Sequence, residues 1–371
     1  MTDLFEPLTL RGVTLRNRIG VSPMCMYSCG PDGMPTEWHL AHLVARAIGG
    51  AAVTFTEAAA VSPEGRISPG DLGIWSDAHI PGHRRLTAAI EAAGSVPGIQ
   101  LAHAGRKASR RAPWEEHGPS EPSWTPLAPS ALPFGDYAVP QAMSEAEIAQ
   151  AIADLAAAAT RSIAAGYRVI ELHAAHGYLM HQFLSPLSNQ RNDAWGGDLD
   201  GRARLAEEAV KAVRAAIPEE VPLLIRVSHT DWVEGGWDTA ETVQLAARVK
   251  ALGVDMVDVS SGGLDHRQKI PLGPGYQLPG AVAVKEGAKV PVAAVGLITE
   301  PAQAQAVVAE GKADLVLLGR VLLRDPYWPL HAAAALGRPD AVPTPPQYER
   351  GWNALGKMPR QMSTAAVQPT L

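Results

Sequence analysis

The chain has 371 residues, of which 46% are hydrophobic, so it can bury a sizeable core. Its formal net charge is −6 at pH 7 and it carries no stripe of basic residues, which argues against a nucleic-acid or membrane-surface protein. No apolar run approaches the roughly 20 residues that a membrane span requires.

The N-terminal segment and the cysteines indicate in which cellular compartment the protein is located. Residues 1–7 are acidic and lack both the basic and the apolar region of a signal peptide. The two cysteines, Cys25 and Cys29, are too few for a disulfide framework and suit a reducing environment. We therefore expect a cytoplasmic protein.

Eight short apolar runs are predicted to form buried parallel strands. Each is nearly continuous in valine, isoleucine and leucine rather than alternating with polar residues, as a parallel strand covered on both faces should be. In chain order the runs are residues 18–24, 52–57, 98–103, 168–173, 222–228, 256–260, 290–295 and 313–318.

Stretches of helical character separate these runs. Ser144 opens, with a capping-box pattern, an alanine-rich helix that ends at Gly166. Asp238 opens a second helix that ends near Gly253, and residues 299–301 place a cap and an early proline before a third. Strand and helix alternate eight times, which predicts an α/β fold of the (β/α)8 TIM-barrel type.

The barrel is expected to occupy residues 1–352 as a single domain, followed by a tail at 353–371 without periodicity. A doubly wound open sheet would show the same alternation, but no Gly-x-Gly-x-x-Gly fingerprint follows the first strand. One segment, 106–143, interrupts the alternation after the third strand. Its seven prolines forbid a long helix, and Trp114 and Trp124 indicate an excursion that packs over the active-site end of the barrel.

In TIM barrels the chemistry lies at the C-terminal ends of the strands. The fourth predicted strand ends at His173, and His176 and Tyr178 follow it, so three groups that can carry a proton emerge together. They can hold and protonate one polar atom of a small substrate.

Two other strand ends predict a phosphate site. Gly296 follows the seventh strand, and Gly319 and Arg320 follow the eighth. Backbone N–H groups at the glycines, together with a guanidinium, form a suitable cradle where barrels commonly bind phosphate.

Several blocks of sequence at these strand ends resemble one family. The blocks are SPMCMYS at 22–28, HAGRK at 103–107, HAAHGYL at 173–179, FLSPLSN at 183–189 and YERGW at 348–352. They are similar to those of the old yellow enzyme family, and more closely to its bacterial, cysteine-containing subgroup typified by YqjM and xenobiotic reductase A. The resemblance runs from about residue 4 to residue 352 and implies a (β/α)8 barrel with non-covalently bound FMN.

The resemblance implies a set of FMN-binding residues. An amide at position 100 would offer a donor and an acceptor to the pyrimidine edge of the flavin, and Arg226 would stabilise negative charge on that ring. The implied cofactor-binding residues are Ser22, Pro23, Met24, Cys25, Ala58, Gln100, Arg226, Gly296, Gly319 and Arg320.

The resemblance also implies that NADPH or NADH reduces the FMN, which passes a hydride to the β-carbon of an α,β-unsaturated carbonyl in a ping-pong cycle. His173 and His176 would hydrogen-bond the carbonyl oxygen of this small-molecule substrate. Tyr178, or water, would protonate the α-carbon. Tyr27 would place a second hydroxyl in the substrate pocket, and Cys25 would tune the flavin potential and meet the substrate.

Arg350 lies in the YERGW block, and the resemblance implies that it reaches the active site of a neighbouring subunit. The protein would then be a homodimer or homotetramer with shared sites.

Two other classes of function stay open. A lyase or aldolase acting on a phosphorylated substrate would need metal ligands or a Schiff-base lysine. Lys107 is the only lysine expected at the mouth, beside Arg106 rather than in an apolar pocket. A non-catalytic scaffold is the other alternative. The histidine pair and two cysteines do not make up a metal-ligand cluster, so we expect no metal.

Overall fold

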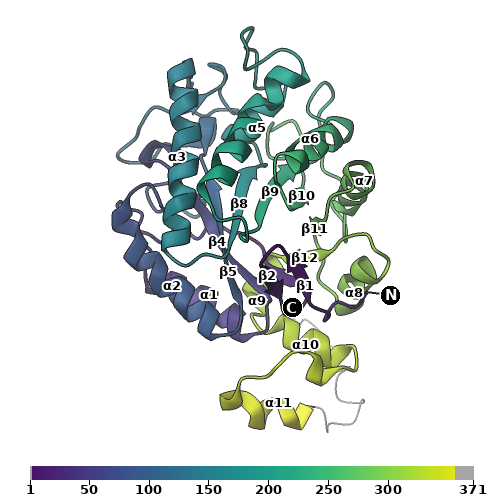
Figure 1. Cartoon of the computed structure of the whole chain (residues 1–371). Coiled ribbons are helices and arrows are strands. Elements are labelled where there is room, and N and C mark those ends of the chain that lie inside the picture. Colours follow the sequence, from purple (N-terminus) through teal and green to yellow (C-terminus); the bar gives the residue numbers. More distant parts are fainter. Residues whose placement is uncertain (1, 356–371) are drawn as a thin grey trace, which may run out of the picture.

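The computed structural model describes residues 2–355, in which eight parallel strands close into a barrel surrounded by helices (Figure 1). Every neighbouring pair around the barrel is parallel, and the order follows the chain from β3 to β12 and back to β3. The strands are β3 (Ile19–Val21), β4 (Val53–Ala60), β5 (Val96–Ala102), β8 (Val169–Ala174), β9 (Leu223–Ser228), β10 (Met256–Ser260), β11 (Val292–Ala294) and β12 (Leu315–Leu318). The predicted (β/α)8 barrel is confirmed, and an open doubly wound sheet is excluded.

Helices connect successive strands and cover the outside of the barrel (Figure 1). Ser144 caps α3 by accepting a hydrogen bond from the Glu147 backbone N–H, and Asp238 caps α6 in the same way through Glu241, as predicted. The helices are α1 (Glu37–Ile48), α2 (Ile80–Ala92), α3 (Glu145–Ala164), α4 (Leu179–Leu184), α5 (Leu199–Ala216), α6 (Thr239–Ala251), α7 (Leu278–Ala288), α8 (Pro301–Ala309), α9 (Arg320–Arg324), α10 (Trp328–Ala335) and α11 (Glu349–Leu355).

A short antiparallel hairpin closes the base of the barrel. It consists of β1 (Leu8–Leu10) and β2 (Val13–Leu15), which the sequence did not predict. Its leucines and valine pack in one apolar cluster with residues of the strands, such as Val53 and Leu224. Water is therefore excluded from the N-terminal ends of the strands, and the opposite end is left to form the site.

The excursion at 106–143 contains no long helix, as predicted. Its regular structure is limited to the two-residue strands β6 (Leu127–Ala128) and β7 (Gln141–Ala142) and short turns. Trp124 donates its indole N–H to the Glu64 carbonyl oxygen at 2.9 Å, which fastens the segment to the loop that follows β4.

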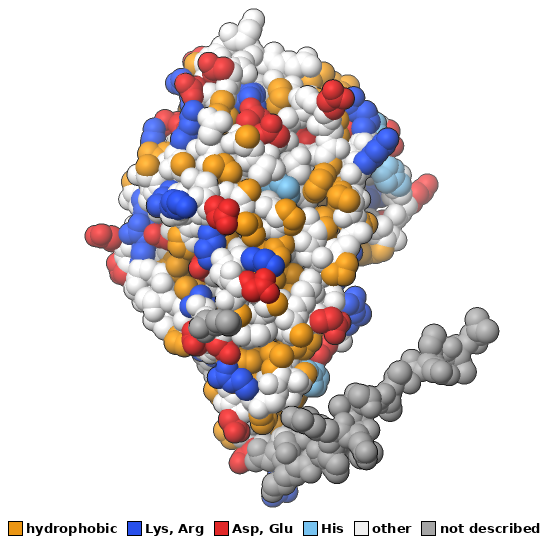
Figure 2. Space-filling model, turned by 90° about the vertical axis from the view of Figure 1, so that its right-hand side faces the viewer, with side chains coloured by type: hydrophobic (Ala, Val, Ile, Leu, Met, Phe, Trp, Pro, Cys, Tyr) orange, Lys and Arg blue, Asp and Glu red, His pale blue; other side chains and the backbone are white. Residues whose placement is uncertain are grey.

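The C-terminal helices α10 and α11 project from the base of the barrel as an arm (Figure 1). Helix α11 includes the first three residues of the predicted tail, 353–355, and the rest of that tail lies outside the described residues. No helix within residues 2–355 is long and apolar enough to cross a bilayer. The face in Figure 2 intersperses acidic and basic side chains without a continuous basic patch.

Candidate active site

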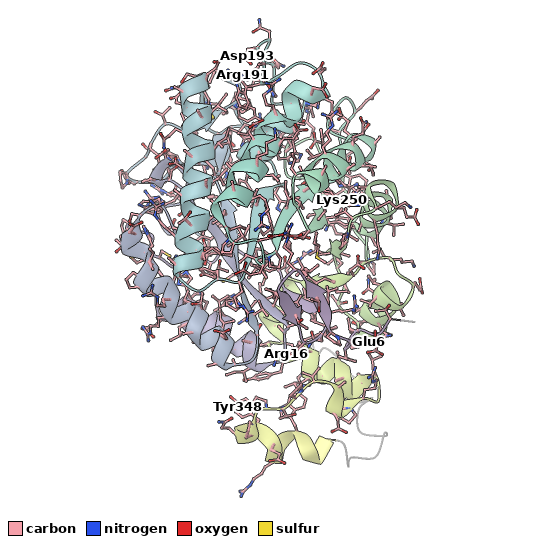
Figure 3. All side chains as sticks on the ribbon, viewed as in Figure 1. Glu6, Arg16, Arg191, Asp193, Lys250 and Tyr348 are labelled. Atoms are coloured by element: carbon pink, nitrogen blue, oxygen red, sulfur yellow. The ribbon has the colours of Figure 1, made fainter. Side chains whose placement is uncertain are left out.

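The C-terminal ends of the strands surround a cavity of about 460 Å³. In Figure 3, Arg191 and Asp193, in a loop that follows β8 and α4, mark this end of the molecule, and Arg16 marks the base. The cavity walls come from β9, β10 and β12 and from the chain after β3, β8, β10, β11 and β12. Of the predicted site residues, the cavity is lined by Ser22, Pro23, Met24, His176, Arg226, Gly296, Gly319 and Arg320.

One end of this cavity is suited to a phosphate. Gly296 has φ +123°, and a Cβ there would lie 2.8 Å from the Gln277 amide nitrogen, so the backbone conformation requires glycine. Arg320 and Arg324 line the same cavity, and neither forms an ion pair within the described residues. Sequence reasoning missed Arg324, although its position one helical turn after Arg320 was a usable signal.

The other end of the cavity contains a buried arginine. Arg226 donates from Nη1 to the Ser22 hydroxyl at 2.9 Å, and its Nε lies 3.1 Å from the Asp258 carboxylate. Gln100 is not on the cavity wall but is buried, and it donates to Glu171 at 2.8 Å. Sequence reasoning missed both carboxylates.

These residues fit FMN by the chemistry of their donors. Two guanidiniums and glycine backbone at one end suit a phosphate, and a buried cation with neighbouring hydroxyl and amide groups suits the electron-rich edge of a flavin ring. The Arg226 guanidinium lines the cavity and is held there by the Asp258 carboxylate and the Ser22 hydroxyl. A buried cation fixed at the wall of a cavity suits an electron-rich ligand.

His173 is presented as a hydrogen-bond donor. Its Nδ1 accepts from the Ala175 backbone N–H at 3.3 Å, so the neutral ring carries its proton on Nε2. Burial, and then the charge of Arg226, hold the pKa of both His173 and His176 well below the usual range. Both imidazoles are therefore neutral near pH 7 and can polarise a substrate without giving up a proton.

His176 and Tyr178 lie next to His173 on the same turn. The ring of His173 is 5.2 Å from that of His176 and 4.9 Å from that of Tyr178. The His176 Nε2 lies 2.7 Å from the Ser260 hydroxyl. Burial raises the pKa of Tyr178 well above its usual range, so the phenol keeps its proton. The structure thus brings together the three groups that the sequence predicted.

Two buried contacts fix this turn. Gly177 has φ +73°, and its N–H donates to the His181 Nδ1 at 2.9 Å. The opposite nitrogen of His181 lies 2.9 Å from the Asp231 carboxylate, and both side chains are fully buried. The pair holds His181 in one orientation, and with it the backbone between His176 and Tyr178.

Lys107 supports the same turn from the loop after β5. Its Nζ donates to the His176 carbonyl oxygen at 2.9 Å and also to that of Gly263. The Nζ lies 4.1 Å from the centre of the Phe134 ring, and burial lowers the pKa of Lys107 to about 7. Lys107 therefore packs against an aromatic ring, but its two carbonyl contacts and the neighbouring charge of Arg106 make the surroundings of its ammonium group polar.

Some of the predicted residues line other hollows instead of this cavity. Cys25 lines a separate apolar groove, Tyr27 lines a hollow beside the 106–143 excursion, and Ala58 lines a small pocket with Tyr178. Burial, reinforced by the Asp71 and Glu57 charges, raises the pKa of Cys25 well above its usual range. Cys25 is thus a neutral thiol rather than a thiolate.

Known proteins resemble this chain over nearly its whole length. Residues 3–339 match the model of the NADH:flavin oxidoreductase / NADH oxidase family. The NADPH dehydrogenase of Geobacillus thermodenitrificans is 46% identical over 353 residues, which cover 95% of this chain and 99% of that protein. A solved structure of an old yellow enzyme homologue from Zymomonas mobilis covers 88% of this chain and 91% of its own, with a TM-score of 0.75 and 27% identity. Morphinone reductase in complex with tetrahydroNAD gives a TM-score of 0.76 at 25% identity, covering 92% and 98% of the two chains.

The barrel, its cavity and these relatives define a flavin-dependent oxidoreductase. The chain belongs to the NADH:flavin oxidoreductase / NADH oxidase family, whose cofactor is FMN, and the predicted resemblance to old yellow enzymes is confirmed.

Proposed function

We propose that this oxidoreductase reduces alkenes conjugated to a carbonyl group. Bound FMN supplies hydride transfer, from a reduced nicotinamide to the β-carbon of the alkene. The observation that carries the proposal is a neutral His173 with a free Nε2–H, next to His176 and Tyr178 and beside the Arg226 cavity.

His173 and His176 hold the carbonyl oxygen of the substrate. The hydrogen bond from His173 draws electron density away from the alkene and becomes stronger as negative charge develops on that oxygen. Tyr178 then gives its phenol proton to the α-carbon, so that hydride and proton together saturate the double bond. Tyr27 lines the substrate side, and Cys25 modulates the site from the neighbouring groove.

Arg226 and Gln100 hold the pyrimidine end of the flavin in this proposal. The guanidinium would stabilise negative charge there, because it is buried and already fixed by Ser22 and Asp258. Gly296, Gly319 and Arg320 hold the phosphate. Ser22, Pro23, Met24, Cys25 and Ala58 complete the proposed flavin contacts.

The nicotinamide enters the same space as the alkene, which gives a ping-pong cycle. Morphinone reductase has been solved with tetrahydroNAD, and the Geobacillus relative is an NADPH dehydrogenase. The described residues 2–355 form one barrel without a second nucleotide-binding fold. We infer that NADPH or NADH stacks where the substrate later binds.

Arg350 completes the site of a second copy of the chain in this proposal. Tyr348, two residues earlier, lies beyond the base of its own barrel, far from the mouth (Figure 3). An apolar groove of about 780 Å³ beside Cys25 leaves Trp38 57% and Leu323 43% exposed, which gives an arm from a neighbour an apolar surface to cover. A homodimer or homotetramer would bury both.

Anaerobic half-reactions test the proposed reaction. NADPH should bleach the yellow holoenzyme, and a stoichiometric addition of cyclohexenone should restore the oxidised flavin spectrum and yield cyclohexanone. Acid should release FMN, rather than FAD, into the supernatant. An enzyme that NADPH reduces but no enone reoxidises would refute the alkene substrate class while leaving the flavin assignment intact.

A further inference from the structure

Two carboxylates and one arginine share the buried floor of the barrel. Glu171 on β8 and Asp258 on β10 are both fully buried. Asp258 lies 3.1 Å from the Arg226 Nε, and Glu171 accepts a hydrogen bond from Gln100 at 2.8 Å. The second oxygen of Glu171 and the Asp258 Oδ1 have no hydrogen-bond partner among the described residues, whereas the Asp258 Oδ2 faces the Arg226 Nε.

The strand register places these groups side by side. Gln100 pairs with Glu171 across β5 and β8, and Arg226 pairs with Asp258 across β9 and β10. Paired residues on parallel strands point to the same face of the sheet, which here is the barrel interior. Gln100 and Arg226 are the two residues proposed to hold the pyrimidine end of the flavin, so each has its own buried carboxyl group behind it.

One buried cation cannot neutralise two buried anions. If both carboxyl groups were ionised, the floor would carry a net negative charge in a medium of low polarity, at a cost that proteins usually avoid by binding a proton. Burial and the charge of Asp258 raise the pKa of Glu171 to about 8. Arg226, whose ion-pair partner is Asp258, keeps the pKa of Asp258 nearer its usual range, at about 6. The shared proton therefore resides mainly on Glu171 near pH 7.

We propose that Glu171 is a positioning residue that holds a proton while FMN is bound, and that its ionisation weakens FMN binding. A neutral Glu171 fixes the Gln100 amide and leaves the positive charge of Arg226 facing the cavity. An ionised Glu171 offsets that charge and repels the electron-rich edge of the flavin. The inference rests on the proposed placement of FMN over Gln100 and Arg226.

The pH dependence of FMN binding is expected to follow from Glu171 and the groups around it. The groups that act on Glu171 are Asp258, Arg226 and Gln100, and its own strand also carries His173, which is neutral near pH 7. Because the pKa of Glu171 is raised, its proton is present at pH 7 and is lost as the pH rises through about 8. If only the protonated form binds FMN, the competent fraction falls from roughly 0.9 at pH 7 to roughly 0.1 at pH 9.

The test is the dissociation constant of FMN, obtained by diluting holoenzyme at pH 7 and at pH 9 and following free-flavin fluorescence. Wild type should bind about tenfold more weakly at pH 9. Glu171→Gln, a neutral isostere, should bind as wild type does at pH 7 and change less than about twofold between the two pH values. A pH-independent wild type, a Glu171→Gln variant with the wild-type pH dependence, or a folded variant without FMN would each overturn the proposal.

Matched variants separate the contribution of Glu171 to the pH dependence of FMN binding from that of other buried titratable groups. Burial raises the pKa of Asp71 to about 8 as well, and burial and the charge of Arg106 lower the pKa of Lys107 to about 7, so Asp71→Asn and Lys107→Met should both keep the tenfold change. If Glu171→Gln fails to fold, the infrared carbonyl band of a protonated carboxyl is measured in Asp71→Asn holoenzyme. That band should be present at pH 7, and its absence at pH 7 overturns the proposal. Arg226→Gln tests the placement separately: wild-type FMN affinity in that variant refutes the proposed flavin site itself.

Discussion

The floor and the rim of the active site are built in different ways. The floor residues Glu171, His173, Arg226 and Asp258 are carried by neighbouring strands and are at most 5% exposed. The rim consists of loops, with Trp114 of the 106–143 excursion 68% exposed and packed edge-on against Tyr27 at 5.6 Å. Floor geometry is set by strand register, whereas rim geometry depends on what covers the loops.

This difference separates the residues that carry out the reaction from those that control access of the substrate. Every floor group is held by a partner from another strand or by the adjacent turn, so a single chain contains the whole floor. The rim leaves large aromatic side chains in solvent and has its proposed final residue, Arg350, on an arm beyond the base of the barrel. Substitutions in the floor should therefore change the reaction, and substitutions in the rim should change substrate binding.

The largest expected effect is in the floor. His173→Ala with His176→Ala should slow reoxidation of the prereduced enzyme by cyclohexenone on the order of a hundredfold to a thousandfold, because the carbonyl oxygen loses its donors. FMN content should stay close to one per chain, because the flavin end is held by other residues. Stopped-flow absorbance under anaerobic conditions measures the rate.

A variant that keeps a donor at one position provides the control. His173→Asn retains an N–H group and should recover part of the lost rate, which a purely structural role for the ring would not produce. Unchanged reoxidation in the double alanine variant would show that the histidines take no part in the mechanism. It would also contradict the proposal that floor residues carry out the reaction and rim residues bind the substrate.

A rim substitution is expected to have an effect of intermediate size, and to change substrate binding rather than the rate of the reaction. Arg350→Ala should raise the substrate KM by about ten- to a hundredfold, as expected for a lost hydrogen bond from a charged group, while kcat changes little. Arg204→Ala, which removes an exposed arginine from α5, is the matched control for net charge and should leave KM unchanged.

Mixed oligomers sharpen this test. Arg350→Ala subunits combined with His173→Ala/His176→Ala subunits should form some sites with an intact floor from one chain and an intact arginine from the other. Activity recovered on mixing supports a shared rim. If labelled subunits exchange and no activity returns, Arg350 acts in its own chain or not at all, and the rim does not require assembly.

Much of the floor was predictable from sequence, because the eight alternating strand and helix patterns predicted a barrel, and polar residues at the C-terminal ends of barrel strands must then meet. His173, Arg226 and Gly319 were found in this way or through the family resemblance. Glu171 was not, because it stands inside an apolar run, where periodicity gives no reason to expect a buried carboxyl group. Its partner Asp258 is hidden in the same way within residues 256–260.

The rim and the base were less predictable, because they depend on contacts between distant segments. The β1–β2 hairpin has strands of three residues each, too short to show a period. The position of Lys107 depends on Phe134, which comes from the far side of a proline-rich loop of irregular conformation. The exposure of Trp38 and Trp114 is a property of the folded surface and has no signature in composition.

Cys25 lies at the boundary between the two regions, and its substitution should have the smallest effect. The thiol follows Met24, which lines the proposed flavin cavity, yet it opens into the apolar groove and is neutral. Cys25→Ser and Cys25→Ala should therefore shift the flavin midpoint potential and the substrate KM while changing turnover by less than about tenfold, the size expected for one weak hydrogen bond. Cys29→Ser, a nearby thiol 3.6 Å from His39, is the control and should leave the potential unchanged. Loss of both half-reactions with FMN still bound would place Cys25 in the floor, as a residue that the chemistry requires.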